Sequence, residues 1–129
     1  MITKQTPNSP IGVFDSGLGG LTVLKSLEKI LPNESFIYFG DTAHVPYGTK
    51  SVDMVTLYSQ HIMDFFLKYE TKAVVIACNT ASAVAFQHLK RNYDIPLFDV
   101  VSPSVEYSMK ITKTQKIGVV GTYLSLIHI

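Results

Sequence analysis

The sequence predicts an α/β fold in which a parallel sheet is covered by helices on both faces. Short apolar runs alternate along the 129-residue chain with amphipathic segments of helical length. Such segments can serve as the crossovers that parallel strands require. Because open α/β sheets bind ligands at the carboxyl ends of their strands, the residues that follow each apolar run are the first candidates for a functional site.

The first elements are a strand, a glycine-rich turn and a helix. Residues 10–15 form an apolar run that ends in an acid, and residues 16–20, Ser-Gly-Leu-Gly-Gly, interrupt it. Leucines then recur at three- and four-residue spacing over 21–31, which predicts an amphipathic helix. A second strand is expected over 35–39. The following segment, 40–49, is too long and too mixed in chemistry for a simple connector, which indicates a functional loop.

The remaining elements continue the alternation of helix and strand. Ser51 is a candidate N-cap for a long helix that runs through Glu70. The elements expected after it are a strand over 73–77, a helix over 79–93, a strand over 97–101, a helix over 103–112 and a strand over 116–121.

Composition limits the classes of function. With a formal net charge of +1, 47% hydrophobic and 16% charged residues, the chain has no electrostatic footprint for nucleic acid or a membrane surface. It lacks a transmembrane-length apolar span and a signal-peptide core, so we expect a cytoplasmic protein of one domain, with any second domain incomplete. One cysteine and four scattered histidines predict neither an intrachain disulfide nor a metal site.

The most informative residue is the lone cysteine, Cys78. It follows the apolar run 73–77 and precedes Asn79 and Thr80, which begin the next expected helix. Unpaired backbone N–H groups and the helix dipole at such a junction favour a thiolate, which can act as a base or a nucleophile. A buried cysteine that merely packs as a small hydrophobe is the alternative. Asn79 and Thr80 could likewise do no more than satisfy N–H groups at the start of the helix.

Three further segments are candidates for the same end of the sheet. The glycines of 16–20 let a backbone approach a ligand, although Thr22 breaks the dinucleotide-binding pattern and a tight turn would explain them equally well. Asp15 could grip an ammonium group or orient a proton transfer, or it could only cap the helix. Residues 46–48, Pro-Tyr-Gly, taken alone are an ordinary turn.

Four motifs, taken together, resemble those of glutamate racemases, in the aspartate/glutamate racemase superfamily. Their order and spacing also match, and the resemblance covers about Ile11 to Thr122. The motifs are Phe-Asp-Ser-Gly-Leu-Gly-Gly-Leu at 14–21, Gly-Asp-Thr with Pro-Tyr-Gly within 40–48, Ala-Cys-Asn-Thr-Ala-Ser at 77–82 and Lys-Ile-Gly-Val-Val-Gly-Thr at 116–122.

The resemblance implies a cofactor-independent isomerase that interconverts L- and D-glutamate for peptidoglycan. Two cysteines of that family exchange the α-proton on opposite faces of the substrate. Carried onto this chain, Cys78 would be one of them, assisted by Asp15. The residues implied to hold glutamate are Asp15, Ser16, Pro46, Tyr47, Gly48, Asn79, Thr80 and Thr122.

The sequence departs from the family in one respect, the absence of a second cysteine. Family members are about twice as long and have two similar three-layer α/β domains. We therefore expect residues 1–99 to be an incomplete first domain and 100–129 the start of a second, with 123–129 truncated or non-native. A homodimer is possible. A non-catalytic paralogue that binds a small carboxylate or a partner chain, and a single-cysteine decarboxylase, are the alternatives.

Overall fold

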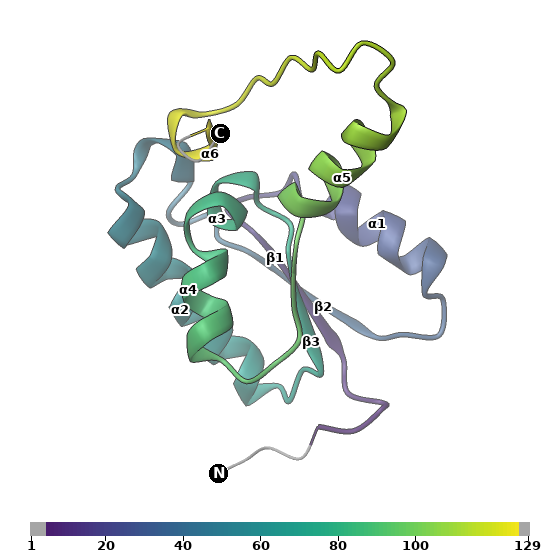
Figure 1. Ribbon diagram of the computed structural model, residues 1–129. Coiled ribbons are helices and arrows are strands. Elements are labelled where there is room, and N and C mark those ends of the chain that lie inside the picture. Colours follow the sequence, from purple (N-terminus) through teal and green to yellow (C-terminus); the bar gives the residue numbers. More distant parts are fainter. Residues whose placement is uncertain (1–4, 127–129) are drawn as a thin grey trace.

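The protein is built on a four-stranded, all-parallel sheet of order β2-β1-β3-β4 (Figure 1). The computed structural model describes residues 5–126. Its elements are β1 (Ile11–Asp15), α1 (Leu21–Ile30), β2 (Phe36–Gly40), the 3-10 turn η1 (Tyr47–Thr49), α2 (Val52–Lys68), β3 (Ala73–Ile76), α3 (Asn79–Val84), α4 (Phe86–Asn92), β4 (Leu97–Asp99), α5 (Val101–Ile111) and α6 (Tyr123–Leu126). The α/β class and the order of the first elements are confirmed.

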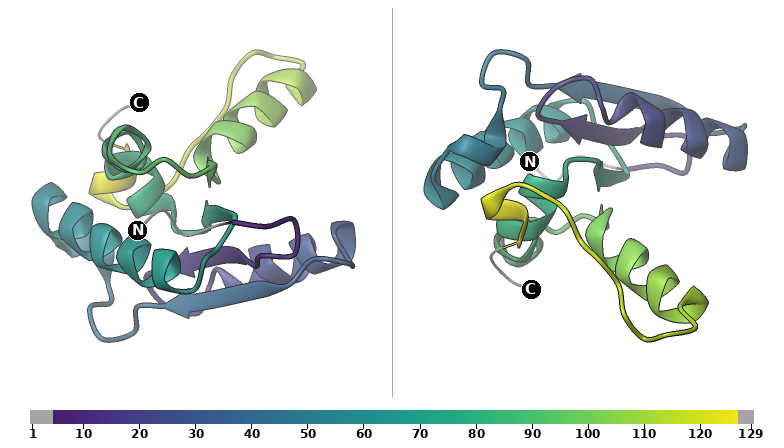
Figure 2. Two further views of the ribbon diagram at one scale, coloured as in Figure 1. Left: turned by 90° about the horizontal axis from the view of Figure 1, so that it is seen from below. Right: turned by 90° about the horizontal axis from the view of Figure 1, so that it is seen from above.

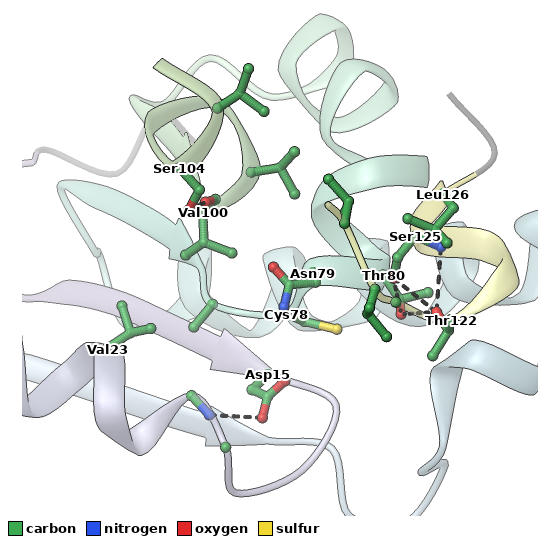
Figure 3. A pocket seen from close by; sticks show the side chains of 18 of the residues that line it. Asp15, Val23, Cys78, Asn79, Thr80, Val100, Ser104, Thr122, Ser125 and Leu126 are labelled. Carbon is green, nitrogen blue, oxygen red and sulfur yellow. Dashed lines mark hydrogen bonds between the residues drawn. The ribbon is translucent and has the colours of Figure 1, made fainter. Parts of the chain in front are cut away.

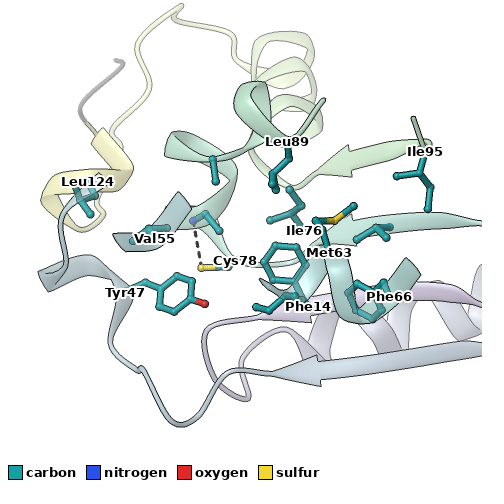
Figure 4. Packing of buried hydrophobic residues seen from close by; sticks show 14 residues of the cluster. Phe14, Tyr47, Val55, Met63, Phe66, Ile76, Cys78, Leu89, Ile95 and Leu124 are labelled. Atoms are coloured by element: carbon teal, nitrogen blue, oxygen red, sulfur yellow. Dashed lines mark hydrogen bonds between the residues drawn. The ribbon is translucent and has the colours of Figure 1, made fainter. Parts of the chain in front are cut away.

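Alternation along the strands divides the sheet into two apolar faces. On one face Ile11, Val13 and Val75 pack with partly buried residues of α1. On the other face Phe14 and Ile76 join the larger core, to which α2 and α4 contribute Phe66 and Leu89 (Figure 4). The period of two that places neighbouring side chains on opposite faces thus makes this a three-layer arrangement.

Helix ends follow from local hydrogen bonds. Ser51 caps α2 as expected, because its hydroxyl accepts the N–H of Met54 at 3.2 Å. The helix ends at Lys68, and Glu70 has a left-handed backbone with φ 53°. The expected strand over 97–101 is shorter in the structure. Asp99 accepts the N–H groups of Val101 and Ser102 at 2.9 and 2.8 Å, which starts α5 instead of extending β4.

The helix expected over 79–93 is divided in two. Ala85 separates α3 from α4, with a φ of −103° that departs from regular helix geometry. Its N–H still bonds to Ala81, and its carbonyl accepts from Leu89. Ala85 and Leu89 are both fully buried in the core, so the two short helices bury one continuous apolar side.

The prediction of a strand over 116–121 was wrong. This segment has no regular structure, and Val120 is fully exposed. A strand forms only where a neighbour supplies its hydrogen bonds, and none of the four strands among residues 5–126 borders this segment. It runs from α5 back to α6, while α5 and α2 lie on opposite sides of the molecule (Figure 2). Of the expected tail, 127–129 lie outside the described residues.

Within residues 5–126, no helix is both long and apolar enough to cross a lipid bilayer.

Candidate functional site

A cavity of about 980 Å³ lies where β1 and β3 end (Figure 3). Its walls come from the turn after β1, the junction between β3 and α3, helix α5 and the stretch 117–126. Polar groups gather near the strand ends, whereas Val23, Val105 and Met109 make its other part apolar. The cavity therefore lies at the end of the sheet where the carboxyl-end rule predicts a ligand site.

Cys78 lies at the wall of this cavity. It is the N-cap residue of α3, and its Sγ accepts the N–H of Ala81 at 3.4 Å. The Ser16 hydroxyl lies 3.6 Å from the same sulfur, although the two residues are 62 positions apart in the chain. The side chain is only 5% exposed and also borders the larger core (Figure 4). The thiol thus touches both the apolar interior and the cavity.

Asp15 combines a capping contact with a place in the cavity wall. Its Oδ2 accepts the N–H of Gly20, the residue that precedes α1, at 2.9 Å, so it does cap the start of that helix. A side chain at Gly20 would not fit, because a Cβ there would lie 2.7 Å from the Asp15 Cβ and 3.0 Å from that of Ala77. Glycine at this position therefore lets the helix begin directly against the carboxylate.

Three hydroxyl groups close the opposite wall. Thr80 Oγ1 lies 3.3 Å from Thr122 Oγ1 and 3.2 Å from Ser125 Oγ, and these last two are 2.8 Å apart. Thr80 and Thr122 were expected from the resemblance. Ser125 was missed, because nothing in its local sequence distinguishes it and it reaches the site only through the turn into α6.

The Pro-Tyr-Gly segment lies beside the cavity but does not line it. Tyr47 is 1% exposed and donates from its phenol to Asp41 at 2.6 Å. Burial raises the pKa of Tyr47 well above its usual value, and the neighbouring Asp41 and Cys78 add to that shift. Gly48 packs against Thr122, which leaves no room for a side chain there. Pro46, which follows a cis peptide bond, is exposed at the start of η1.

Asp41 is a second residue that sequence reasoning missed. Besides Tyr47 it binds His44, whose Nδ1 lies 2.8 and 2.9 Å from its two carboxylate oxygens. The His44 ring stacks on Tyr58 with centroids 4.0 Å apart. Its place in the Gly-Asp-Thr motif after β2 was the available signal.

The structure therefore brings six of the expected site residues to one cavity. They are Asp15, Ser16, Cys78, Asn79, Thr80 and Thr122. Asn79 is exposed at the start of α3, while Thr80 is buried. Among residues 5–126 no three histidine, cysteine, aspartate or glutamate side chains are grouped as metal ligands. The roles of the six remain predictions.

The fold is a parallel α/β fold, and a thiol, a carboxylate and hydroxyl groups surround a cavity at its strand ends. These features are typical of α/β enzyme domains, whose cavities of this kind bind small polar ligands. The family model for Asp/Glu/hydantoin racemases matches residues 11–126 of this sequence. The chain belongs to that family.

Relatives of similar sequence are named glutamate racemases. The chain is 50% identical over 116 residues to one from Geobacter metallireducens, with 90% of this chain and 43% of the relative covered. It is 49% identical over 118 residues to one from Thermus thermophilus, with 92% and 45% covered. The chain thus spans a little under half the length of the curated relatives it matches.

Solved structures show the same relationship. Glutamate racemase RacE1 from Bacillus anthracis superposes with a TM-score of 0.91 at 40% identity, covering 95% of this chain and 46% of the other. The Francisella tularensis glutamate racemase, crystallised with D-glutamate, gives 0.83 at 43% identity and covers 93% and 45%.

Proposed function

We propose that the parent protein of this chain is a glutamate racemase and that Cys78 moves the α-proton on one face of the substrate. The observation that carries the proposal is the position of the only thiol of the sequence. Its sulfur lies in the wall of the cavity, 3.6 Å from the Ser16 hydroxyl and beside Asp15. A family whose relatives are named for glutamate supports the choice of substrate.

In the proposed first step the Cys78 thiolate removes the α-proton of glutamate. The Cα–H bond breaks, an S–H bond forms, and the electron pair moves toward the α-carboxylate. Because the mechanism we propose uses no cofactor, fixed hydrogen-bond donors must stabilise that charge. Ser16 and Thr80 are suitable donors at the cavity wall, and Asp15 lies where it can attract the substrate ammonium.

Inversion needs a proton donor on the opposite face, since a single base tends to return the proton to the face it left. With Cys78 the only cysteine here, a second thiol must come from outside this sequence. We therefore propose that the isolated chain exchanges the α-proton weakly and racemises little. The proposed role of the complete, cytoplasmic enzyme is to supply D-glutamate for peptidoglycan.

The proposal is tested by incubating the chain with L-glutamate in D₂O. Proton NMR follows the loss of the α-proton, and a chiral assay follows D-glutamate. We expect slow exchange with retained configuration, abolished in Cys78→Ser. Serine remains a good N-cap for α3, so this variant should keep the fold while it loses the thiol.

Two results would contradict the proposal. Exchange that persists unchanged in Cys78→Ser would remove the cysteine from the chemistry. Rapid formation of deuterated D-glutamate by the isolated chain would show that the second thiol is not needed. Tyr93→Phe, which alters a hydroxyl near Asp64 and outside the cavity lining, serves as the control that should exchange like the wild type.

A second candidate is a non-catalytic paralogue that binds a small carboxylate or a partner chain. The observation that favours it is the burial of Cys78, which is 5% exposed and caps α3 as a packed side chain would. This candidate predicts binding of glutamate without any α-proton exchange. The same NMR sample distinguishes the two functions.

A further inference from the structure

We propose that Tyr38 is a positioning residue of this site, which holds the turn after β1 in the shape that presents Ser16 and Gly19 to the cavity. The phenol of Tyr38, in the middle of β2, donates to the Gly17 carbonyl at 3.0 Å across 21 positions of sequence. The inference rests on the proposed function, because the turn matters only if the cavity binds glutamate.

Tyr38 acts from outside the cavity. Ser16, Gly19 and Gly20 line the cavity, whereas neither Gly17 nor Tyr38 does. The bonded carbonyl thus lies within the turn, between residues that face the ligand. A constraint on Gly17 restricts the lining residues on both sides of it, while the phenol touches no substrate.

A second contact brings the same carbonyl against β2. At Gly40, the last residue of that strand, an added Cβ would overlap the Gly17 carbonyl and would lie 3.2 Å from Cε1 of the Tyr38 ring. The absence of a side chain at Gly40 lets the turn approach the strand closely enough for the phenol to reach it. Two residues of one strand therefore define the position of Gly17.

The electrostatic surroundings keep the phenol a donor. Burial raises the pKa of Tyr38, and the nearby Asp15 and Cys78 raise it further. A hydroxyl that stays protonated throughout the ordinary pH range keeps its proton for the carbonyl. Two other contacts restrain the turn: Asp15 accepts the Gly20 N–H, and the Ser16 hydroxyl lies 3.6 Å from the Cys78 sulfur. Among the side-chain hydrogen bonds described for residues 5–126, that of Tyr38 is the one that ties the turn to β2, and without the phenol this connection is lost.

The test compares Tyr38→Phe with Tyr93→Phe in this chain. Both changes remove one phenolic hydroxyl, and that of Tyr93 lies far along the chain, 2.9 Å from Asp64 and 3.2 Å from the Gln60 carbonyl. Amide hydrogen exchange is measured without ligand, and glutamate affinity is measured by NMR titration. Gly40→Ala is a second variant, which adds a Cβ that overlaps the Gly17 carbonyl.

We expect Tyr38→Phe to accelerate exchange of the Gly20 and Leu21 amides roughly two- to tenfold, which corresponds to the loss of one ordinary hydrogen bond. Glutamate binding should weaken by a similar factor. Gly40→Ala should accelerate the same amides. Tyr93→Phe should change neither these amides nor the affinity, although it lowers global stability. A merely structural role for Tyr38 would instead spread the acceleration over the whole sheet.

The ligand-free exchange decides this inference even if the chain does not bind glutamate. Unchanged Gly20 and Leu21 amides in Tyr38→Phe would overturn it, and so would an acceleration that Tyr93→Phe reproduces. Wild-type affinity with altered amides would also overturn it, because the turn would then not matter to the ligand. Failure of the wild-type chain to bind glutamate would contradict the α-proton exchange proposed for this chain, while the amide-exchange data would still test whether Tyr38 restrains the turn.

Discussion

The phenol of Tyr47 donates a 2.6 Å hydrogen bond to Oδ2 of Asp41, six residues earlier in the same loop. Both side chains are buried, and the carboxylate is also bonded to His44. A buried carboxylate is costly unless donors surround it. The loop after β2 is therefore organised around one charged group, and Tyr47 supplies its shortest bond.

Removal of this bond should destabilise the protein more than removal of a peripheral one. We expect Tyr47→Phe to lower the free energy of unfolding by about 1.5–3 kcal/mol, because a buried charged acceptor loses a donor. Tyr93→Phe is the control, at about 1 kcal/mol, since its acceptors are less buried. Urea denaturation of both variants measures the difference. Equal losses would show that the Asp41 carboxylate does not depend on Tyr47.

The two roles of Asp15 can be separated by substitution. Asp15→Asn keeps an oxygen that can accept the Gly20 N–H, so stability should hardly change. Asp15→Ala removes the cap and should cost about 1 kcal/mol. Both should slow α-proton exchange about a hundredfold if the carboxylate assists the proton transfer. Thermal unfolding measures the stability of each variant, and NMR measures its rate of α-proton exchange. If Asp15→Asn exchanges the α-proton as fast as the wild type, Asp15 only caps the helix.

Gly20 should tolerate no side chain. An added Cβ would meet the Asp15 Cβ at 2.7 Å, the Ala77 Cβ at 3.0 Å and the Tyr38 hydroxyl at 3.1 Å. We expect Gly20→Ala to lose about 1–3 kcal/mol by overpacking. Gly118→Ala is the matched control, because no atom lies within 4 Å of its added Cβ. Denaturation midpoints that shift equally in both variants would contradict the packing described for Gly20.

Alkaline pH should reduce the contribution of Tyr93 to the stability of the folded protein. Burial and the bond to Asp64 raise the pKa of Tyr93 from 10.0 to about 12. The protonated phenol contributes fully to the free energy of unfolding below pH 10, where both the folded and the unfolded chain keep the proton. The contribution is lost as the pH rises toward 12, because the phenol ionises at lower pH in the unfolded chain than in the folded one. The stability difference between wild type and Tyr93→Phe should therefore shrink across that window. A difference that stays constant in urea titrations would contradict the raised pKa.

The apolar surface of α5 and the segment after it should promote self-association. Val105 and Met109 are 56% and 62% exposed, and Ile117 is 45% exposed. Exposed apolar side chains clustered in this way favour contacts between molecules. We expect the mean mass measured by light scattering to rise with protein concentration, and to rise less in Met109→Lys. Lys110→Glu, on the same helix, is the control, and a strictly monomeric wild type would contradict the expectation.

Local patterns sufficed wherever a single segment decides its own structure. The apolar runs that form β1 and β3, the cap at Ser51 and the leucine spacing of α1 depend on neighbours in sequence, and each was found as expected. The placement of Asp15 and Cys78 at adjacent strand ends followed from the parallel topology alone. These features required no knowledge of which distant segments meet.

The features that the sequence did not predict depend on contacts with other side chains or with distant segments. Residues 116–121 have the composition of a strand, but pairing depends on a partner that lies elsewhere in a chain. The end of β4 depended on a side chain, because Asp99 offered its carboxylate to the next N–H groups. Ser125 reaches the cavity wall through its contact with Thr80, and Asp41 is bound by Tyr47 beside the cavity; no local pattern encodes either contact.

The sequence by itself determined the α/β class, the order of the first elements and the group of residues that face one end of the sheet, because periodicity and chain direction are properties of consecutive residues. Only the tertiary structure decided that Tyr38 reaches Gly17, that Thr80 meets Thr122 and Ser125, and that residues 116–121 join none of the strands described within 5–126. The physical reason is that a hydrogen bond between distant segments forms only where the whole chain brings donor and acceptor to within about 3 Å.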